Sequence, residues 1–509
     1  MQSFRSEIEN PVVEKDILDL AKKIAQFKAG EIHEEKFRSL RLARGVYGQR
    51  QQGVQMIRIK LPYGKIQFHQ WKRISDISDE YSTGNLHLTT RQDIQIHYVS
   101  LDRTPELWAK LEQDDITLRE ACGNTVRNIT ASPTSGIDPK ELFDVSPHAD
   151  AAFRYFLRNP ICQEMGRKIK MSFSNTDEDT SLAYLHDVGF IPKIVDGKRG
   201  FKVVVGGGLG AQPMLAHVAH EFLAEDQVIP FIEAILRVFD RHGERNSRHK
   251  ARMKFLIQKI GFEAFMDLVK AESKALKNHT FEIPSATAWE VTPPTLVADV
   301  HAPATEDYAT WLATNTFEQK QKGFHAVYVR ILNGNISSTT SRSLIEALTG
   351  YIGDDIRITI NQGLMLKYVP TANLAYVYSV LEAHGLAAPG ANSIANITAC
   401  PGTDTCNLAI SDSTNITSKL EAVITEEFPS LIHDSAMKIK ISGCMNACGQ
   451  HSMASIGFHG SSLKAADKRV LPALQVLLGG ATLGNGEGKI ADKVIKVPSK
   501  RGPQVLRTL

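Results

Sequence analysis

Asn128-Ile129-Thr130-Ala131-Ser132-Pro133 recurs later in the chain as Asn396-Ile397-Thr398-Ala399-Cys400-Pro401. Other landmarks recur in the same order at almost the same offset. Four of them share a single offset: Gly64 and Gly334, Arg91-Gln92 and Asn361-Gln362, Tyr98-Val99 and Tyr368-Val369, and Lys168-Ile169-Lys170-Met171-Ser172 and Lys438-Ile439-Lys440-Ile441-Ser442. Self-similarity at a fixed offset indicates a duplicated structural unit. The sequence therefore predicts two copies of a unit about 270 residues long.

The two copies differ at positions that carry chemistry. The second copy has Cys400 where the first has Ser132, and the first copy has Arg58 and Arg127 where the second has uncharged residues. Two related units are expected to pack about a pseudo-twofold axis, with a site at their interface. We therefore expect one copy to hold a metal centre and the other to supply positive charge to an anionic substrate.

Local patterns place several elements. Residues 54–61 and 86–98 alternate in polarity, which predicts two strands with a helix between them. Residues 17–27 repeat apolar side chains at helical spacing, and the prolines of 281–310 predict a linker between the copies. The arginines at positions 41, 44 and 50 are expected to form a solvated surface loop.

Four cysteines lie in two close pairs near the C-terminal end. Cys400 and Cys406 form a C-x5-C pair, and Cys444 and Cys448 form a C-x3-C pair. Four thiolates suit an iron–sulfur cluster. A structural zinc site remains an alternative, although zinc knuckles use shorter spacings than C-x5-C, and a third possibility is that no metal binds. Disulfides are disfavoured because six cysteines serve 509 residues.

Composition and charge narrow the class of protein. The formal net charge is only +3, which gives no bulk attraction to nucleic acid, and no apolar run is long enough to cross a membrane. The start of the chain, Met1-Gln2-Ser3-Phe4-Arg5, lacks the apolar region of a signal peptide. We therefore expect a cytoplasmic protein without a membrane or nucleic-acid partner.

Two further motifs have more than one interpretation. The basic stretch from Arg241 to Lys254 suits a nucleic acid, a polycarboxylate or phosphate ligand, or a solvated face. The stretch Val205-Gly206-Gly207-Gly208-Leu209-Gly210-Ala211 fits G-x-G-x-x-A, but no acidic residue completes a dinucleotide-binding unit. Glycines here also allow the backbone to approach a cofactor closely.

Over residues 40–490 the chain resembles the sirohaem-containing sulfite and nitrite reductases. The motifs that carry the resemblance are the two cysteine pairs, Thr90-Arg91-Gln92, Arg127-Asn128, Arg167-Lys168-Ile169-Lys170, Val205-Gly206-Gly207-Gly208 and Asn361-Gln362. The resemblance implies an α+β fold with pseudo-twofold duplication, built from two ferredoxin-like half-domains and two α/β cofactor domains. The boundaries that it implies are an N-terminal segment (1–50), the first half-domain (51–118), the first α/β domain (119–280), a linker (281–316), the second half-domain (317–390) and the second α/β domain (391–509).

The resemblance also implies roles for individual residues. Cys400, Cys406, Cys444 and Cys448 would bind a 4Fe–4S cluster, and Cys448 would also be the proximal ligand of the sirohaem iron. Four cations would surround the substrate anion: Arg58, Arg127, Lys168 and Lys170. The carboxylates of sirohaem would be held by Arg91, Gln95, Arg167, Arg248, Arg252, Lys254, Gln362 and Asn446.

The resemblance implies six-electron reduction of sulfite to sulfide or, as the alternative, of nitrite to ammonia. Related nitrite reductases tend to carry Asn where this chain has Lys170, which favours sulfite. The remote alternative is a non-catalytic binding protein whose fold is stabilised by a bound metal. Because no flavin or nicotinamide domain is evident, electrons would come from ferredoxin or a separate flavoprotein subunit. His87 and Met445 depart from the family pattern, and Cys122 is expected to be an ordinary core residue.

Overall fold

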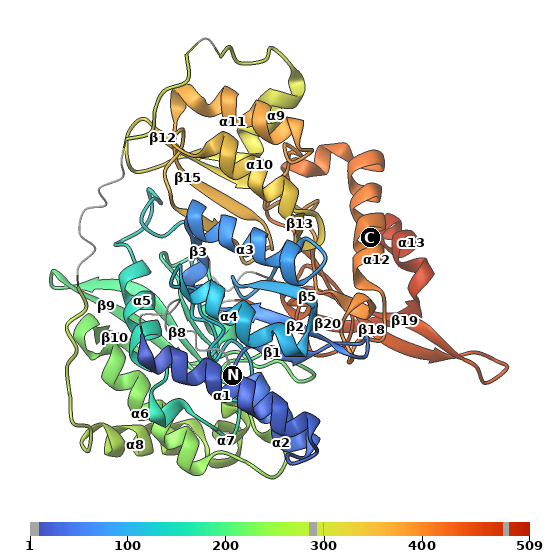
Figure 1. The fold of residues 1–509 in the computed structure, drawn as a ribbon. Coiled ribbons are helices and arrows are strands. Elements are labelled where there is room, and N and C mark those ends of the chain that lie inside the picture. Colours follow the sequence, from blue (N-terminus) through green and yellow to red (C-terminus); the bar gives the residue numbers. More distant parts are fainter. Residues whose placement is uncertain (1–9, 285–292, 299, 482–487) are drawn as a thin grey trace.

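Four five-stranded sheets organise the described part of the chain, two in each copy (Figure 1). The computed structural model describes residues 10–284, 293–298, 300–481 and 488–509. The first five residues, and part of the expected linker, lie outside these ranges. Sheet 1 has the order β1-β2-β5-β4-β13 and sheet 2 the order β11-β12-β15-β14-β3. Sheet 3 has the order β10-β9-β8-β7-β6 and sheet 4 the order β16-β17-β18-β19-β20.

Sheets 1 and 2 are the two copies of one small unit. In the first copy the elements are β1 (Val46–Gly48), β2 (Val54–Ile59), β3 (Lys65–Ile66), α3 (Phe68–Tyr81), β4 (Asn85–Leu88), β5 (Ile94–Ser100) and α4 (Thr104–Glu112). In the second copy they are β11 (Thr316–Glu318), β12 (Phe324–Val329), β13 (Asn335–Ser337), α10 (Ser338–Leu348), β14 (Ile356–Ile358), β15 (Leu364–Pro370) and α11 (Leu374–Ala383). The bounds of β2 and β12, and of β5 and β15, differ by the same offset that separates Gly64 from Gly334, which confirms the duplication.

Sheets 3 and 4 belong to the larger unit of each copy. The first contains β6 (Thr130–Ala131), α5 (Ser146–Phe156), β7 (Met171–Phe173), β8 (Val188–Val195), β9 (Lys198–Val205), β10 (His217–Ala224), α6 (Val228–His242), α7 (Met253–Ile260) and α8 (Phe262–Ser273). The second contains β16 (Thr398–Ala399), α12 (Ser413–Ala422), β17 (Ile439–Ser442), β18 (Ile456–Lys464), β19 (Val470–Leu478), β20 (Asp492–Pro498) and α13 (Gly502–Thr508). In Figure 1 the β18–β19 hairpin projects from the body of the molecule.

The two copies exchange short strands. β13 of the second copy pairs with β4, and β3 of the first copy pairs with β14, so each small sheet is completed by the other copy. Helices α3 and α10 lie side by side across this junction (Figure 1), where Arg342 forms an ion pair with Asp79. One apolar core, including Trp71 and Trp311, runs through both small units. The two copies therefore form one continuous structure rather than two separate domains joined by a linker.

Two glutamines repeat the same cross-connection. Gln92 Nε2 donates to Ile358 O (3.0 Å), and Gln92 Oε1 accepts from Ala131 N (3.0 Å). Gln362 Nε2 donates to Leu88 O (3.1 Å), and Gln362 Oε1 accepts from Ala399 N (2.8 Å). Each glutamine side chain thus links the small sheet of the other copy to the larger sheet of the copy in which the glutamine lies, at the first strand of that larger sheet.

The structure corrects four local expectations. Residues 86–98 form β4 and β5 rather than one strand, because Gln92 adopts φ +56° at the turn between them. The expected linker contains α9 (Glu306–Asn315), whose Trp311 is buried, and residues 1–50 contain α1 (Pro11–Lys28), α2 (Glu34–Leu42) and strand β1 of sheet 1. Residues 205–211 lead into β10 and not into a helix, which excludes the dinucleotide-binding motif. Among the described residues, no helix combines the length and apolar character that a membrane span needs.

Candidate functional site

The two cysteine pairs meet at one edge of sheet 4. β16 and β17 run parallel, and the chain leaves both strands at the same edge, into the loops of Cys400 and Cys444. The loops touch through glycines, because a Cβ on Gly443 would lie 2.7 Å from the Cα of Gly402. Gly402 also has φ +54°, a conformation that favours glycine. The close approach of the two loops therefore depends on these two residues.

The four thiols are electrostatic neighbours. Burial and then the nearby Cys448 raise the pKa of Cys400 to about 12, and burial likewise raises the pKa values of Cys406 and Cys444. Gly443 N donates to Cys400 Sγ (3.1 Å), and all four cysteines are free of disulfides. No three His, Cys, Asp or Glu side chains of the described residues are close enough for a single metal ion. Four neighbouring thiols are the usual ligand set of an iron–sulfur cluster.

The first copy braces these loops. Arg50 N donates to Thr405 O (2.8 Å), and its guanidinium donates to Cys406 O (3.3 Å) and Ala409 O (2.7 Å). Thr90 Oγ1 donates to Cys448 O (2.8 Å). The expectation of a solvated loop is wrong for Arg44, which is buried and pairs with Asp19 (2.6 Å), whereas Arg50 is exposed as expected but also binds the cysteine loop. Spacing could not have revealed this role, because Arg50 and Cys406 lie in different copies, far apart in the sequence.

The four residues expected around the anion come from three segments. Arg58 lies on β2, Arg127 follows the loop 119–126, and Lys168 and Lys170 flank Ile169 just before β7. Arg127 N donates to Ile169 O (3.0 Å), which joins the last two segments directly. Arg58 lies 3.5 Å from the buried Asp93 carboxylate.

Positive charge exceeds negative charge here, although Arg58 is paired with Asp93. Burial, and then repulsion by Lys170 and Arg127, holds the pKa of Lys168 well below its ordinary value. Burial, and then Arg91 and Arg252, lowers the pKa of Lys170 to about 7, against an opposing attraction from Cys448. Neither lysine Nζ has a hydrogen bond or ion pair to the described residues. Excess positive charge of this kind would suit an anionic ligand, and Cys448 is an electrostatic neighbour of Lys170 and Arg58.

The residues expected to hold sirohaem fall into two groups. The side chains of the first group already bind other groups of the protein. They are Arg91 (bound to Asn128 O, Met171 O and His186), Arg252 (bound to Asp187), Lys254 (bound to the carbonyls of Gly208, Leu209 and Gln212) and Gln362 (bound to Leu88 O and Ala399 N). Asn446 Nδ2 donates to Cys444 Sγ (3.4 Å). No side-chain hydrogen bond joins Gln95, Arg167 or Arg248 to the described part of the chain. Gln362 thus links the copies, and its amide is not free for a cofactor.

The residues present fit a polycarboxylate. The buried Nε atoms of Arg58 and Arg167 have no hydrogen-bond partner among the described residues. Burial and then Arg248 and Arg252 lower the pKa of Arg167 to about 10. Unpaired buried cations are costly unless an anion accompanies them. The unsatisfied Nε of Arg167 and the two lysines without partners among the described residues therefore match the chemistry of an anionic tetrapyrrole.

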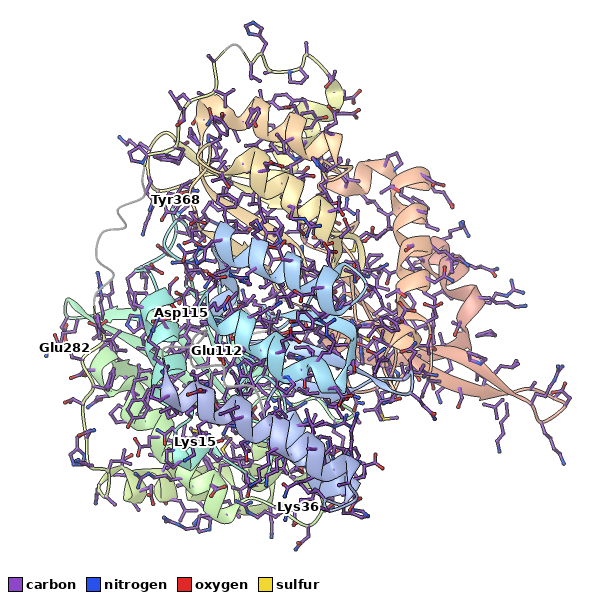
Figure 2. All side chains as sticks on the ribbon, viewed as in Figure 1. Lys15, Lys36, Glu112, Asp115, Glu282 and Tyr368 are labelled. Carbon is purple, nitrogen blue, oxygen red and sulfur yellow. The ribbon has the colours of Figure 1, made fainter. Side chains whose placement is uncertain are left out.

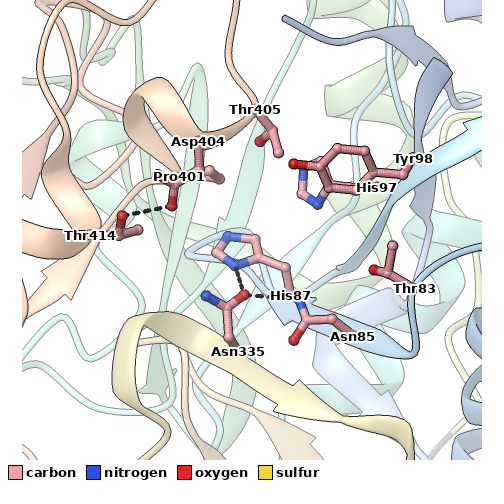
Figure 3. A pocket seen from close by; sticks show the side chains of 10 residues that line it. All are labelled: Thr83, Asn85, His87, His97, Tyr98, Asn335, Pro401, Asp404, Thr405 and Thr414. Atoms are coloured by element: carbon pink, nitrogen blue, oxygen red, sulfur yellow. Dashed lines mark hydrogen bonds between the residues drawn. The ribbon is translucent and has the colours of Figure 1, made fainter. Parts of the chain in front are cut away.

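A pocket of about 150 Å³ separates sheet 1 from the C-x5-C loop (Figure 3). His87 and His97 lie on its sheet side, and Asp404 and Thr405 lie on its loop side. His87 Nδ1 lies 3.0 Å from Asn335 Oδ1 of the other copy. Burial lowers the pKa of His87 to about 4 and that of His97 to about 3, so both rings are neutral near pH 7. His97 and Asn335 had no motif that could have marked them in the sequence.

Another residue missing from the sequence expectations is Tyr47 on β1. It is half-buried, and its hydroxyl is an electrostatic neighbour of Arg58, Arg127 and Arg167. Tyr47 therefore borders the cationic site, where a phenol can donate a hydrogen bond to an anion. Cys122, expected to be a core residue, is buried, and it neighbours Arg58 and Arg127.

Comparison with known proteins identifies both units. The family described as "Nitrite and sulphite reductase 4Fe-4S domain" matches residues 122–277 and 390–509. The family described as "Nitrite/Sulfite reductase ferredoxin-like half domain" matches residues 47–114 and 317–384. The matched segments follow the two copies of each unit.

Similar curated proteins have both activities in their names. The chain is 27% identical to "Sulfite reductase [ferredoxin] 1" of Mycolicibacterium paratuberculosis over 87% of this chain and 79% of that protein. It is 28% identical to the "Assimilatory ferredoxin-dependent nitrite reductase" of Haloferax mediterranei over 91% and 80%. The solved structure of the Mycobacterium tuberculosis NirA protein shares the fold, with a TM-score of 0.82, 24% identity and coverage of 97% of this chain and 91% of that one. The chain is an α+β protein that belongs to the nitrite and sulphite reductase family of oxidoreductases.

Proposed function

We propose that this chain reduces sulfite to sulfide with six electrons, at a sirohaem coupled through Cys448 to a 4Fe–4S cluster. The observation that carries the choice of sulfite is the pair Lys168 and Lys170, two neighbouring lysines without protein partners in the described structure. Sulfite bears more negative charge than nitrite at neutral pH. A second lysine in the site therefore favours sulfite over nitrite electrostatically.

Cys400, Cys406, Cys444 and Cys448 would hold the cluster, and Arg167, Arg248 and Gln95 would face the carboxylates of the sirohaem. When bound, the two groups supply single electrons to a substrate on the haem iron. Arg91, Arg252 and Lys254 would act mainly by keeping the cationic wall in place, since their side chains already bind protein groups.

The four cations divide the work according to their chemistry. Arg58 and Arg127 stay charged and would clamp the anion, because a guanidinium presents fixed donors. Lys170, whose pKa is near 7, can hold a proton at Nζ and give it to an oxygen that leaves as water. Lys168 lies beside it, and an anion in the site would favour its charged form as well. This is a reason for two lysines rather than two arginines.

Nitrite reduction to ammonia is the second candidate, and it is supported by the nitrite reductases among the similar proteins. Ferredoxin is the proposed electron donor, because the names of both sulfite and nitrite reductases among them specify it. A flavoprotein subunit is the alternative donor.

The test is kcat/KM for sulfite and for nitrite, measured on holoprotein with a reduced viologen dye. We expect a preference for sulfite, and we expect Lys170→Asn to shift the ratio toward nitrite by about tenfold or more, the effect of one charge contact in a partly buried site. Lys438→Asn is the matched control, because it removes the counterpart of Lys168 in the second copy, a lysine whose Nζ donates to the backbone carbonyl of Ser435 (2.7 Å). A preference for nitrite would refute the substrate assignment, and turnover of neither anion would refute the reductase itself.

A further inference from the structure

A buried ion pair lies behind the four cations. Lys60 and Glu120 are 2% and 0% exposed, and Lys60 Nζ lies 3.7 Å from Glu120 Oε2. Neither residue belongs to the cationic set, and no sequence motif marks either of them. A buried pair of this kind gives little net stability compared with apolar residues, so its presence calls for another explanation.

Lys60 connects the segments that carry the cations. It follows Arg58 by two positions, at the end of the same strand. Its Nζ donates to Val126 O (3.1 Å), the residue before Arg127. Val126 in turn bridges to Ile169, which lies between Lys168 and Lys170. One ammonium group thus lies where the three segments meet.

Glu120 fixes the loop that holds Arg127. Its Oε1 accepts from Arg158 N (3.0 Å) and Gln163 Nε2 (2.6 Å), while Oε2 accepts no hydrogen bond from the described residues and lies 3.7 Å from Lys60 Nζ. Arg127 donates to the carbonyls of the next turn, at Gly123 (3.0 Å) and Ala121 (3.3 Å).

Glu120 also adopts φ +62°, a conformation that a non-glycine residue keeps only when its surroundings enforce it. The support extends outward, because Arg158 Nη2 lies 3.8 Å from Glu112, labelled in Figure 2. The loop therefore depends on the Glu120 contacts.

We propose that Lys60 and Glu120 are positioning residues that keep Arg58, Arg127, Lys168 and Lys170 in register for an anionic substrate. The inference rests on the proposed function, since it assigns the pair to the same anion site. The cations lie close enough to repel one another, because Lys170 and Arg127 follow burial as causes of the lowered pKa of Lys168. A rigid connection behind them prevents the three segments from moving apart in the absence of substrate.

Removing one partner alone would leave a buried charge unpaired and could prevent folding. The informative variant is therefore the double change Lys60→Met with Glu120→Gln, which removes both charges and keeps similar volumes. The matched control is Arg357→Met with Asp355→Asn, another buried ion pair (2.5 Å), located in sheet 2 of the other copy. Both proteins are prepared with cofactors, and their iron content and thermal midpoint are measured first.

The readout compares an anion with a neutral substrate. Hydroxylamine carries no charge at pH 8 and is two electrons from ammonia, so its reduction needs the cofactors without the anion clamp. We expect the Lys60/Glu120 variant to raise KM for sulfite and nitrite by about tenfold or more, as for a misplaced binding group. We expect its hydroxylamine kcat to stay within about twofold of wild type, and the control variant to keep both values.

Anion binding is also measured by calorimetry, with sulfite titrated into oxidised holoprotein. Weaker sulfite binding in the Lys60/Glu120 variant alone would support the inference even if neither anion is turned over, a result that would refute only the proposed reductase. Unchanged anion KM and sulfite affinity would overturn it. Equal losses for anions and hydroxylamine, or equal losses in both variants, would also overturn it, because they would indicate general damage.

Discussion

Gln92 and Gln362 make equivalent contacts in the two copies, so the same substitution can be made at both positions and its effects compared. Gln92→Ala removes the donor to Ile358 O and the acceptor of Ala131 N, and Gln362→Ala removes the equivalent partners, Leu88 O and Ala399 N. Both side chains are buried, at 0% and 2% exposure. Each change leaves two buried backbone groups unsatisfied, at about 1–3 kcal/mol apiece. We expect each variant to lose about 2–6 kcal/mol of stability.

The consequences for the cofactor should differ. Ala399 precedes Cys400, whereas its counterpart Ala131 precedes Ser132. Gln362→Ala should therefore lower bound iron and acid-labile sulfide per chain, and Gln92→Ala should leave both close to wild type at an equal fall in thermal midpoint. Equal cluster loss in the two variants would refute the reasoning, and so would an unchanged midpoint in either.

Three further predictions concern single residues. Burial, then repulsion by Arg357, lowers the pKa of Lys367 to about 7. The cost of burying its charge is therefore complete below pH 7 and disappears near its ordinary pKa, so wild-type stability should gain up to about 1.4 kcal/mol per pH unit between these two values. Lys367→Met should remove this gain, and the same change in thermal midpoint between pH 7 and pH 9 in both proteins would contradict the prediction. Gly443→Ala should push the cysteine loops apart and lower the iron content, and a full complement of iron would contradict the proposed clash. Arg50→Ala should speed loss of cluster iron to a chelator, because it removes donors to two loop carbonyls; an unchanged rate would show that Arg50 does not brace the cluster loop.

The sequence was sufficient for features that repeat or that cluster along the chain. The constant offset between landmarks predicted the duplication, since β2 and β12 obey it, and the spacing of the cysteines predicted two neighbouring loops. Short elements escaped prediction. β3 (Lys65–Ile66) and β13 (Asn335–Ser337) are too short for any periodicity, and their exchange between sheets depends on tertiary contacts.

Side-chain partners were the least predictable feature. Gln362 lies in a motif suggestive of cofactor binding, yet its amide is bonded to Leu88 and Ala399. Lys254 ends a basic stretch, yet it holds backbone carbonyls of the loop 208–212. Lys60 and Glu120 are far apart in the sequence and have no motif. A charged residue reveals its type in the sequence, but only the fold determines which group neutralises it.

The pseudo-twofold symmetry allows the proposed anion site to be compared with its counterpart in the other half. The row Arg58, Gln95, His87 and Asn335 crosses sheet 1, and its counterpart in sheet 2 is the row Tyr328, Met365, Arg357 and Lys65.

The row in sheet 2 is covered by the loop of the first copy that contains Ser135 and Ile137. Ile137 packs on Met365 and Tyr368, and Ser135 O accepts from the buried Lys367 Nζ (2.6 Å). Over sheet 1 the position of Ile137 is taken by Thr405 of the second copy, and the pocket beside His97 remains open. The contact of Ile137 with Met365 and Tyr368 buries apolar surface, which stabilises the duplicated body. The other interface can then keep unpaired cations, whose burial is costly until an anion is bound.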